Sequence, residues 1–146
     1  MPTKARTKLA CKIARINPDR LNEAVSVGRY TCAPETSPGS SRLFGVDDIV
    51  ALCIYAQLIR SGVSDERAWQ FSCDALREFH DKPDVEVLSR LVGANSVVLW
   101  IDQMHNPGVK YRGPGVIQSW MGFDIKELRS RVAADLDDEP TVKGEE

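Results

Sequence analysis

The chain has 146 residues, which is the length of one domain or of a small domain with an extension. Its composition is 42% hydrophobic, 27% charged and 7% aromatic, which excludes the collagenous, disordered and disulfide-framework classes. The net charge of −2 is polarised, because residues 1–29 carry +5 and residues 124–146 carry −4. A basic amino-terminal region on a weakly acidic protein is typical of a small nucleic-acid-binding domain, with a solvated, frayed end as the alternative.

Membrane and secretion signals are not expected in this chain. No stretch approaches the roughly 18 consecutive apolar residues of a membrane span. The amino-terminal sequence MPTKARTKLACKIARI also lacks the uninterrupted apolar run and the cleavage site of a secretory signal. We therefore expect a cytoplasmic protein that makes no membrane contact.

Two short helices are predicted near the amino end. Apolar residues at helical spacing predict the first over about Lys8–Arg15. Asn17 is a suitable N-cap and Pro18 suits the first helical position, so a second helix is predicted from there to about Val27, where Gly28 ends it. Two short helices joined by a tight turn form a candidate helix-turn-helix, although helical hairpins that bind no DNA are more numerous.

A loop and two longer helices come next. The segment Tyr30–Phe44 is rich in Pro, Ser, Thr and Gly and is predicted to be a hairpin-like loop, with a flexible linker as the alternative. The helix predicted over Asp47–Ser61 is apolar around most of its circumference, so it should be largely buried. Its first residues, Asp47 and Asp48, are interpreted as a helix cap. A further helix is predicted over Asp65–Phe79.

The remaining third of the chain mixes helix and strand signals. A short helix is predicted over Val85–Val92, and two β-branched and aromatic runs, Ser96–Ile101 and Val116–Met121, predict a hairpin with a long loop. A helix over about Ile125–Leu136 follows, and residues 137–146 form an acidic tail expected to be disordered. The predicted fold class is therefore mainly α (α+β).

From about residue 9 to 79 the order of elements resembles the winged helix-turn-helix DNA-binding head of the mercury-resistance (MerR) type regulators. The most specific piece is RLFGVDDIVAL, residues 42–52, which is similar to the end of the family's wing followed by its acidic cap and third helix. Residues 59–64, IRSGVS, are similar to the family's Leu-Arg-x-x-Gly-Phe-Ser junction. Where the family's second helix has Arg-Tyr-Tyr-Glu, this chain has Asn22-Glu23-Ala24-Val25, and a hairpin and an acidic helix replace the family's long dimerising coiled coil.

The resemblance implies a sequence-specific, double-stranded DNA-binding transcriptional regulator of bacterial or phage type. Residues 1–80 would form the DNA-binding head, and we expect them to fold on their own because their two long helices carry their own apolar faces. Residues 81–136 would form a homodimer or bind a partner such as the transcription machinery or another regulator. Such a protein would be associated with the nucleoid in the cytoplasm.

The candidate DNA-binding residues fall into two groups. The amino-terminal part of a recognition helix reaches base edges in the major groove, which selects Asp19, Arg20, Asn22 and Glu23. Of these, Arg20 and Asn22 have the chemistry to read guanine and adenine. Basic residues around the two helices and the loop are expected to contact phosphates: Lys8, Lys12, Arg15, Arg29 and Arg42. For each residue, an ordinary solvated surface position is the alternative.

No catalytic, metal or cofactor site is expected. His80 and His105 are isolated from each other, and no phosphate-binding loop or nucleophile motif is present. The cysteines stand about twenty residues apart and never form a close pair. Cys53 and Cys73 are interpreted as small core residues, whereas Cys11 and Cys32 are left open.

The alternative function is a protein–protein interaction or adaptor module, or a small excision-type accessory factor, built on the same winged-helix scaffold. In either function the predicted hairpin would supply an apolar dimer or partner face, or pack on its own head instead. Its residues are Val97, Val98, Leu99, Trp100, Ile117 and Trp120.

Overall fold

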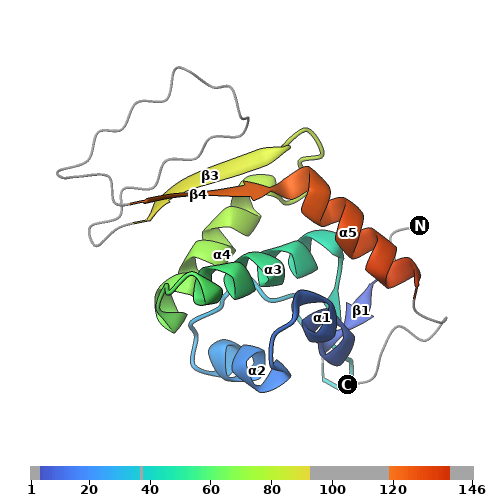
Figure 1. Ribbon diagram of the computed structural model, residues 1–146. Helices are drawn as coiled ribbons and strands as arrows, with labels where there is room; N and C mark the ends of the chain where they lie inside the picture. The colour runs from blue at the N-terminus through green and yellow to red at the C-terminus, as the bar shows by residue number, and fades with distance from the viewer. Residues whose placement is uncertain (1–3, 37, 93–118, 139–146) are drawn as a thin grey trace.

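The computed structural model describes residues 4–36, 38–92 and 119–138 (Figure 1). These residues form a mainly helical α+β fold with two small antiparallel sheets, which confirms the predicted fold class. No helix within the described ranges is both long enough and apolar enough to cross a membrane. In chain order the elements are β1 (Ala5–Arg6), α1 (Thr7–Ala14), α2 (Pro18–Ser26), β2 (Leu43–Phe44), α3 (Val46–Arg60), α4 (Asp65–Phe79), β3 (Val87–Val92), β4 (Ser119–Asp124) and α5 (Ile125–Asp137).

The turn between α1 and α2 is built by local signals. Arg15 ends α1 in the left-handed conformation, with φ of 61°. The side-chain oxygen of Asn17 accepts a hydrogen bond from the backbone N–H of Asp19 at 2.8 Å, and Pro18 is the first residue of α2. Gly28 has a φ of +80°, which a residue with a side chain rarely adopts. The predicted cap and stop of the second helix are therefore confirmed.

Helix α3 occupies the centre of the molecule, with α1, α4 and α5 packed against it (Figure 1). Its buried residues lie all around its circumference, as the prediction required. The same hydrophobic core also receives residues from the far end of the chain, namely Leu88, Phe123, Ile125, Val132 and Leu136. The division at residue 80 stays a prediction, because shared packing does not show whether the first part folds alone.

The helix predicted over Val85–Val92 is wrong. Residues Val87–Val92 form strand β3, which pairs antiparallel with β4 in a register that places Leu88 opposite Phe123. A short sequence with this pattern suits either a helix or a strand, and the hydrogen bonds offered by β4 decide in favour of the strand. The strand predicted over Val116–Met121 overlaps β4, which extends to Asp124, whereas its predicted partner Ser96–Ile101 lies outside the described residues.

The segment Tyr30–Phe44 is not a hairpin in its described part. Its last two residues form β2, and this strand pairs with β1 at the amino end, with Ala5 opposite Phe44. A disulfide between Cys32 and Cys73 then ties the segment to α4, with the two Cα atoms 5.4 Å apart. The segment is therefore held by the amino end and by α4 rather than by strands of its own.

The cysteine predictions are partly confirmed. Cys53 is a buried free thiol in α3, as predicted, and Cys11 is buried in α1. Cys73 is also buried, but the prediction that it is simply a small core residue is wrong because it is bonded to Cys32. The two cysteines are separated by 41 positions in the sequence, and only the packing of the loop on α4 brings them together.

Candidate nucleic-acid interface

Helix α1 presents a basic outer side. Its apolar positions, including Leu9, Ala10 and Ala14, are buried against α3, so the intervening Lys8 and Lys12 are exposed. No acidic residue precedes Asp19 in the chain. The predicted phosphate-contacting lysines therefore share one face of one helix.

Three arginines surround a small hollow at the turn between α1 and α2. The hollow has a volume of about 210 Å³, and its lining includes Arg15, Arg20 and Arg60 together with Asn17 and Tyr55. Arg15 and Arg20 come from the predicted site. Sequence reasoning missed Arg60, whose position at the end of α3 in the linear sequence gives no sign that it approaches the turn.

The exposed side of α2 is acidic. Leu21 and Ala24 are buried, whereas Asp19, Asn22 and Glu23 share the opposite, exposed side of the helix. A helix surface with two carboxylates repels the phosphate backbone, so it can approach DNA closely only where base edges compensate. The predicted base-reading residues are thus brought together, but with a charge opposite to that of α1.

Arg20 and Arg29 are both linked to the amino end of α4 through Asp65. The Tyr55 hydroxyl donates a hydrogen bond to the Asp65 carboxylate, and Arg29 contacts the other carboxylate oxygen at 3.3 Å. A side-chain hydrogen bond with Tyr55 raises the pKa of Arg20. Burial raises the pKa of Tyr55 to about 12, so its hydroxyl remains a donor.

The Tyr55 ring holds this network in position. It stacks on the ring of Trp69 with a centroid distance of 3.6 Å and an interplanar angle of 15°. Because Tyr55 of α3 is fixed by Trp69 of α4, its contact with Arg20 lies beside the turn between α1 and α2.

Arg42 forms a hydrogen bond within the loop Tyr30–Phe44. Its guanidinium donates a hydrogen bond to the backbone carbonyl of Pro34, and the side chain is half-buried. This contact closes the Pro- and Ser-rich loop on itself ahead of β2. The expected phosphate contact of Arg42 stays a prediction.

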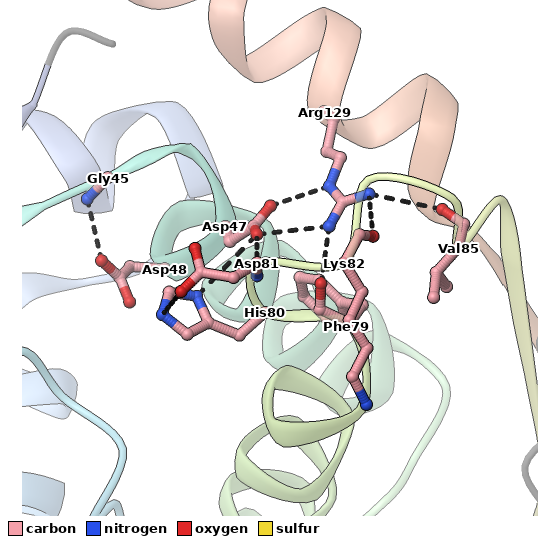
Figure 2. A network of polar contacts seen from close by, with 9 residues as sticks. All are labelled: Gly45, Asp47, Asp48, Phe79, His80, Asp81, Lys82, Val85 and Arg129. Carbon is pink, nitrogen blue, oxygen red and sulfur yellow. Dashed lines mark hydrogen bonds and ion pairs between the residues drawn. The ribbon is translucent and has the colours of Figure 1, made fainter.

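A second polar network, which the sequence did not predict, joins α5 to the start of α3 (Figure 2). Arg129 forms a two-point ion pair with Asp47, with N–O distances of 2.8 Å from Nε and 3.2 Å from Nη2. The same guanidinium donates to the backbone carbonyls of Phe79, Lys82 and Val85. The helix cap itself is provided by Asp48, which accepts from the Gly45 N–H at 2.9 Å, so the interpretation as a cap is confirmed for Asp48 and wrong for Asp47.

The polar network around Asp47 includes side chains of the types that bind metal ions, but Asp47 forms an ion pair with Arg129. Oxygen and nitrogen atoms of Asp47, His80 and Asp81 lie within 4.8 Å of one another. Both Asp47 oxygens already accept hydrogen bonds from Arg129, and the Asp81 N–H donates to one of them. A cation at this position would have to compete with the guanidinium charge, so the arrangement favours a structural role in joining α3 to α5.

Comparison with known protein families and with curated protein sequences finds no match to this chain.

Proposed function

We propose that this protein is a sequence-specific, double-stranded DNA-binding transcriptional regulator of bacterial or phage type. In this proposal α1 and α2 are the helix-turn-helix of a winged head like that of the MerR type, and the segment Tyr30–Phe44 takes the place of the wing. The observation that carries the proposal is the gathering of Arg15, Arg20 and Arg60 around the turn, beside the exposed lysines of α1. Such a cationic surface next to an exposed helix is the electrostatic pattern of a duplex-binding module.

The two helices would have separate roles. Lys8, Lys12 and Arg15 would contact phosphates and set the position of the head on the duplex. On α2, Asn22 would read adenine, and the carboxylates of Asp19 and Glu23 would accept hydrogen bonds from cytosine amino groups. Because those carboxylates repel the backbone, binding to unrelated sequences would be weak, and the discrimination between sites would be correspondingly large.

The proposal includes a homodimer, since natural operators commonly pair two half-sites. It also places the protein in the cytoplasm in association with the nucleoid. The hairpin residues expected to form the dimer or partner face, Val97 to Trp100 and Ile117, lie outside the described residues, and nothing is described of the Trp120 side chain.

The acidic side of α2 favours a second candidate, a protein–protein interaction module or an excision-type accessory factor. Besides Asp19 and Glu23, α2 is followed by Val27, whose side chain is 57% exposed. An exposed apolar residue beside carboxylates suits a basic protein partner better than a phosphate backbone.

A salt titration with matched variants separates these functions. The duplex is a site enriched from random sequences by the purified full-length protein. We expect Lys8→Ala to weaken binding to every duplex and to reduce the slope of log K against log salt by about one. Arg20→Ala should cost about 1–3 kcal/mol on the enriched site and relax the preference at one base pair. Lys126→Ala, an exposed lysine on α5, is the control and should bind as the wild type does.

The DNA-binding proposal fails if no sequence is enriched, or if Lys8→Ala and Lys126→Ala have the same salt slope. In that event the interaction-module function replaces it.

A further inference from the structure

A large cleft lies on the surface where α1 and α3 meet the carboxy-terminal elements. It has a volume of about 760 Å³ and lies between α1 and α3 on one side and β4 and α5 on the other. This volume is within the range of pockets that hold small organic ligands. The cleft reaches Arg15 at the turn between α1 and α2. A ligand in it would therefore contact both α1 and α5.

Part of the cleft lining is apolar. Ile13 comes from α1, Ile54 from α3, Phe123 from β4 and Leu128 from α5. The Cys53 thiol also lines the cleft and is almost fully buried. Since burial raises the pKa of Cys53, the thiol stays protonated and adds to the apolar surface rather than acting as a nucleophile.

Three arginines line the same cleft, namely Arg15, Arg60 and Arg131. None of the ion pairs found among the described residues involves any of them. Arg131 opposes the rise that burial causes in the pKa of the Cys53 thiol, so its guanidinium lies near that thiol in the lining of the cleft. A cationic group beside apolar side chains is the arrangement that binds an acidic group on an apolar body.

Three acidic residues also line the cleft, and one of them is engaged in a helix cap. Asp124 is the N-cap of α5, and its side chain accepts a hydrogen bond from the Glu127 N–H at 2.9 Å. Glu127 itself is exposed, and Asp135 lies one helical turn after Arg131. Burial has the largest effect on the pKa of the Cys53 thiol and raises it; Asp135 also raises it, whereas Arg131 and Arg60 lower it. Two guanidinium groups and one carboxylate therefore act on this part of the cleft.

We propose that this cleft binds a small organic anion. The apolar body of the ligand lies against Ile54, Phe123 and Leu128, and its carboxylate, sulfonate or phosphate group pairs with Arg131 and Arg60. This inference goes beyond the proposed function and does not require that the protein bind DNA.

The probe for this site is 8-anilinonaphthalene-1-sulfonate, which combines an apolar ring system with one anionic group. We expect the full-length protein to bind it saturably and with one-to-one stoichiometry, measured by fluorescence and by calorimetry under conditions where near-ultraviolet circular dichroism shows a folded protein. Its uncharged relative N-phenyl-1-naphthylamine has the same rings without the sulfonate. It should bind at least about tenfold more weakly, because the charge-assisted hydrogen bonds are lost.

Variants assign the binding to the cleft. Arg131→Gln should weaken binding of the sulfonate by about tenfold, whereas Arg131→Lys, which keeps the charge, should retain most of the affinity. Arg77→Gln, an exposed arginine on α4 that does not line the cleft, is the matched control and should bind as the wild type does.

Three results would overturn the proposal. They are no saturable binding of the sulfonate up to about 1 mM, equal affinity for the charged and uncharged probes, and equal affinity of Arg131→Gln and the wild type. If Arg131→Gln does not fold, Arg60→Gln carries the same expectation. Because no DNA is present, these outcomes are independent of those that test the proposed function.

Discussion

Replacement of Cys32 by serine is expected to lower the free energy of unfolding by about 4 kcal/mol. The Cys32–Cys73 disulfide closes a loop with a sequence separation of 41 residues, so its loss frees a long stretch of the unfolded chain. In the folded state it joins the segment before β2 to α4, where the Thr31 hydroxyl also contacts the Cys73 sulfur at 3.6 Å. Guanidinium unfolding of both proteins without reductant measures the difference.

The reduced wild type provides the control. A thiol reductant should lower the stability of the wild-type protein toward that of Cys32→Ser and leave the variant itself unchanged. Equal stability of the two proteins without reductant would show that the disulfide does not stabilise the fold.

The disulfide also bears on the proposed cytoplasmic location. Reducing systems of the cytosol open most disulfides, whereas oxidising compartments preserve them. In a cytoplasmic setting the reduced, less stable form is therefore expected to predominate. The segment Tyr30–Phe44 would then be held at its end by the pairing of β2 with β1 and internally by the Arg42 contact with Pro34.

The second large effect is expected from Arg129→Met, which should lower the free energy of unfolding by about 3 kcal/mol. The substitution removes both hydrogen bonds to Asp47 and those to three backbone carbonyls, in a site where the two side chains are 19% and 17% exposed. Methionine keeps an apolar stem above the Phe79 ring, so the loss reports mainly on the guanidinium. Thermal and guanidinium unfolding measure it.

Arg77→Met is the matched control, because Arg77 also pairs with an aspartate but does so in solvent. Its side chain is 64% exposed and lies 3.4 Å from Asp74, so the substitution should cost no more than about 0.5 kcal/mol. If Arg129→Met were as small in effect as Arg77→Met, the network in Figure 2 would not be what holds α5 to α3.

The helices of the first 80 residues could be predicted because their signals are local. Asn17, Pro18 and Gly28 mark the ends of α2 through interactions within a few residues. The apolar pattern of α3 predicted its burial because a helix that is apolar on every side is stable only when it is covered. The lysines of α1 could likewise be placed on its exposed side, because helical periodicity alone separates them from the buried positions.

Other features depend on contacts between residues far apart in the chain, and no local sequence pattern predicts them. Val87–Val92 is a strand because β4 offers it hydrogen bonds, and Cys73 is bonded because the loop packs on α4. Arg60 lines the same hollow as Arg15 and Arg20. Arg129 forms an ion pair with Asp47, which lies 82 positions earlier in the sequence. Local backbone preferences and helix caps act over a few residues, so they can be read along the chain. Disulfides, ion pairs and clefts require two segments to meet, and that is decided by how the whole core packs around α3.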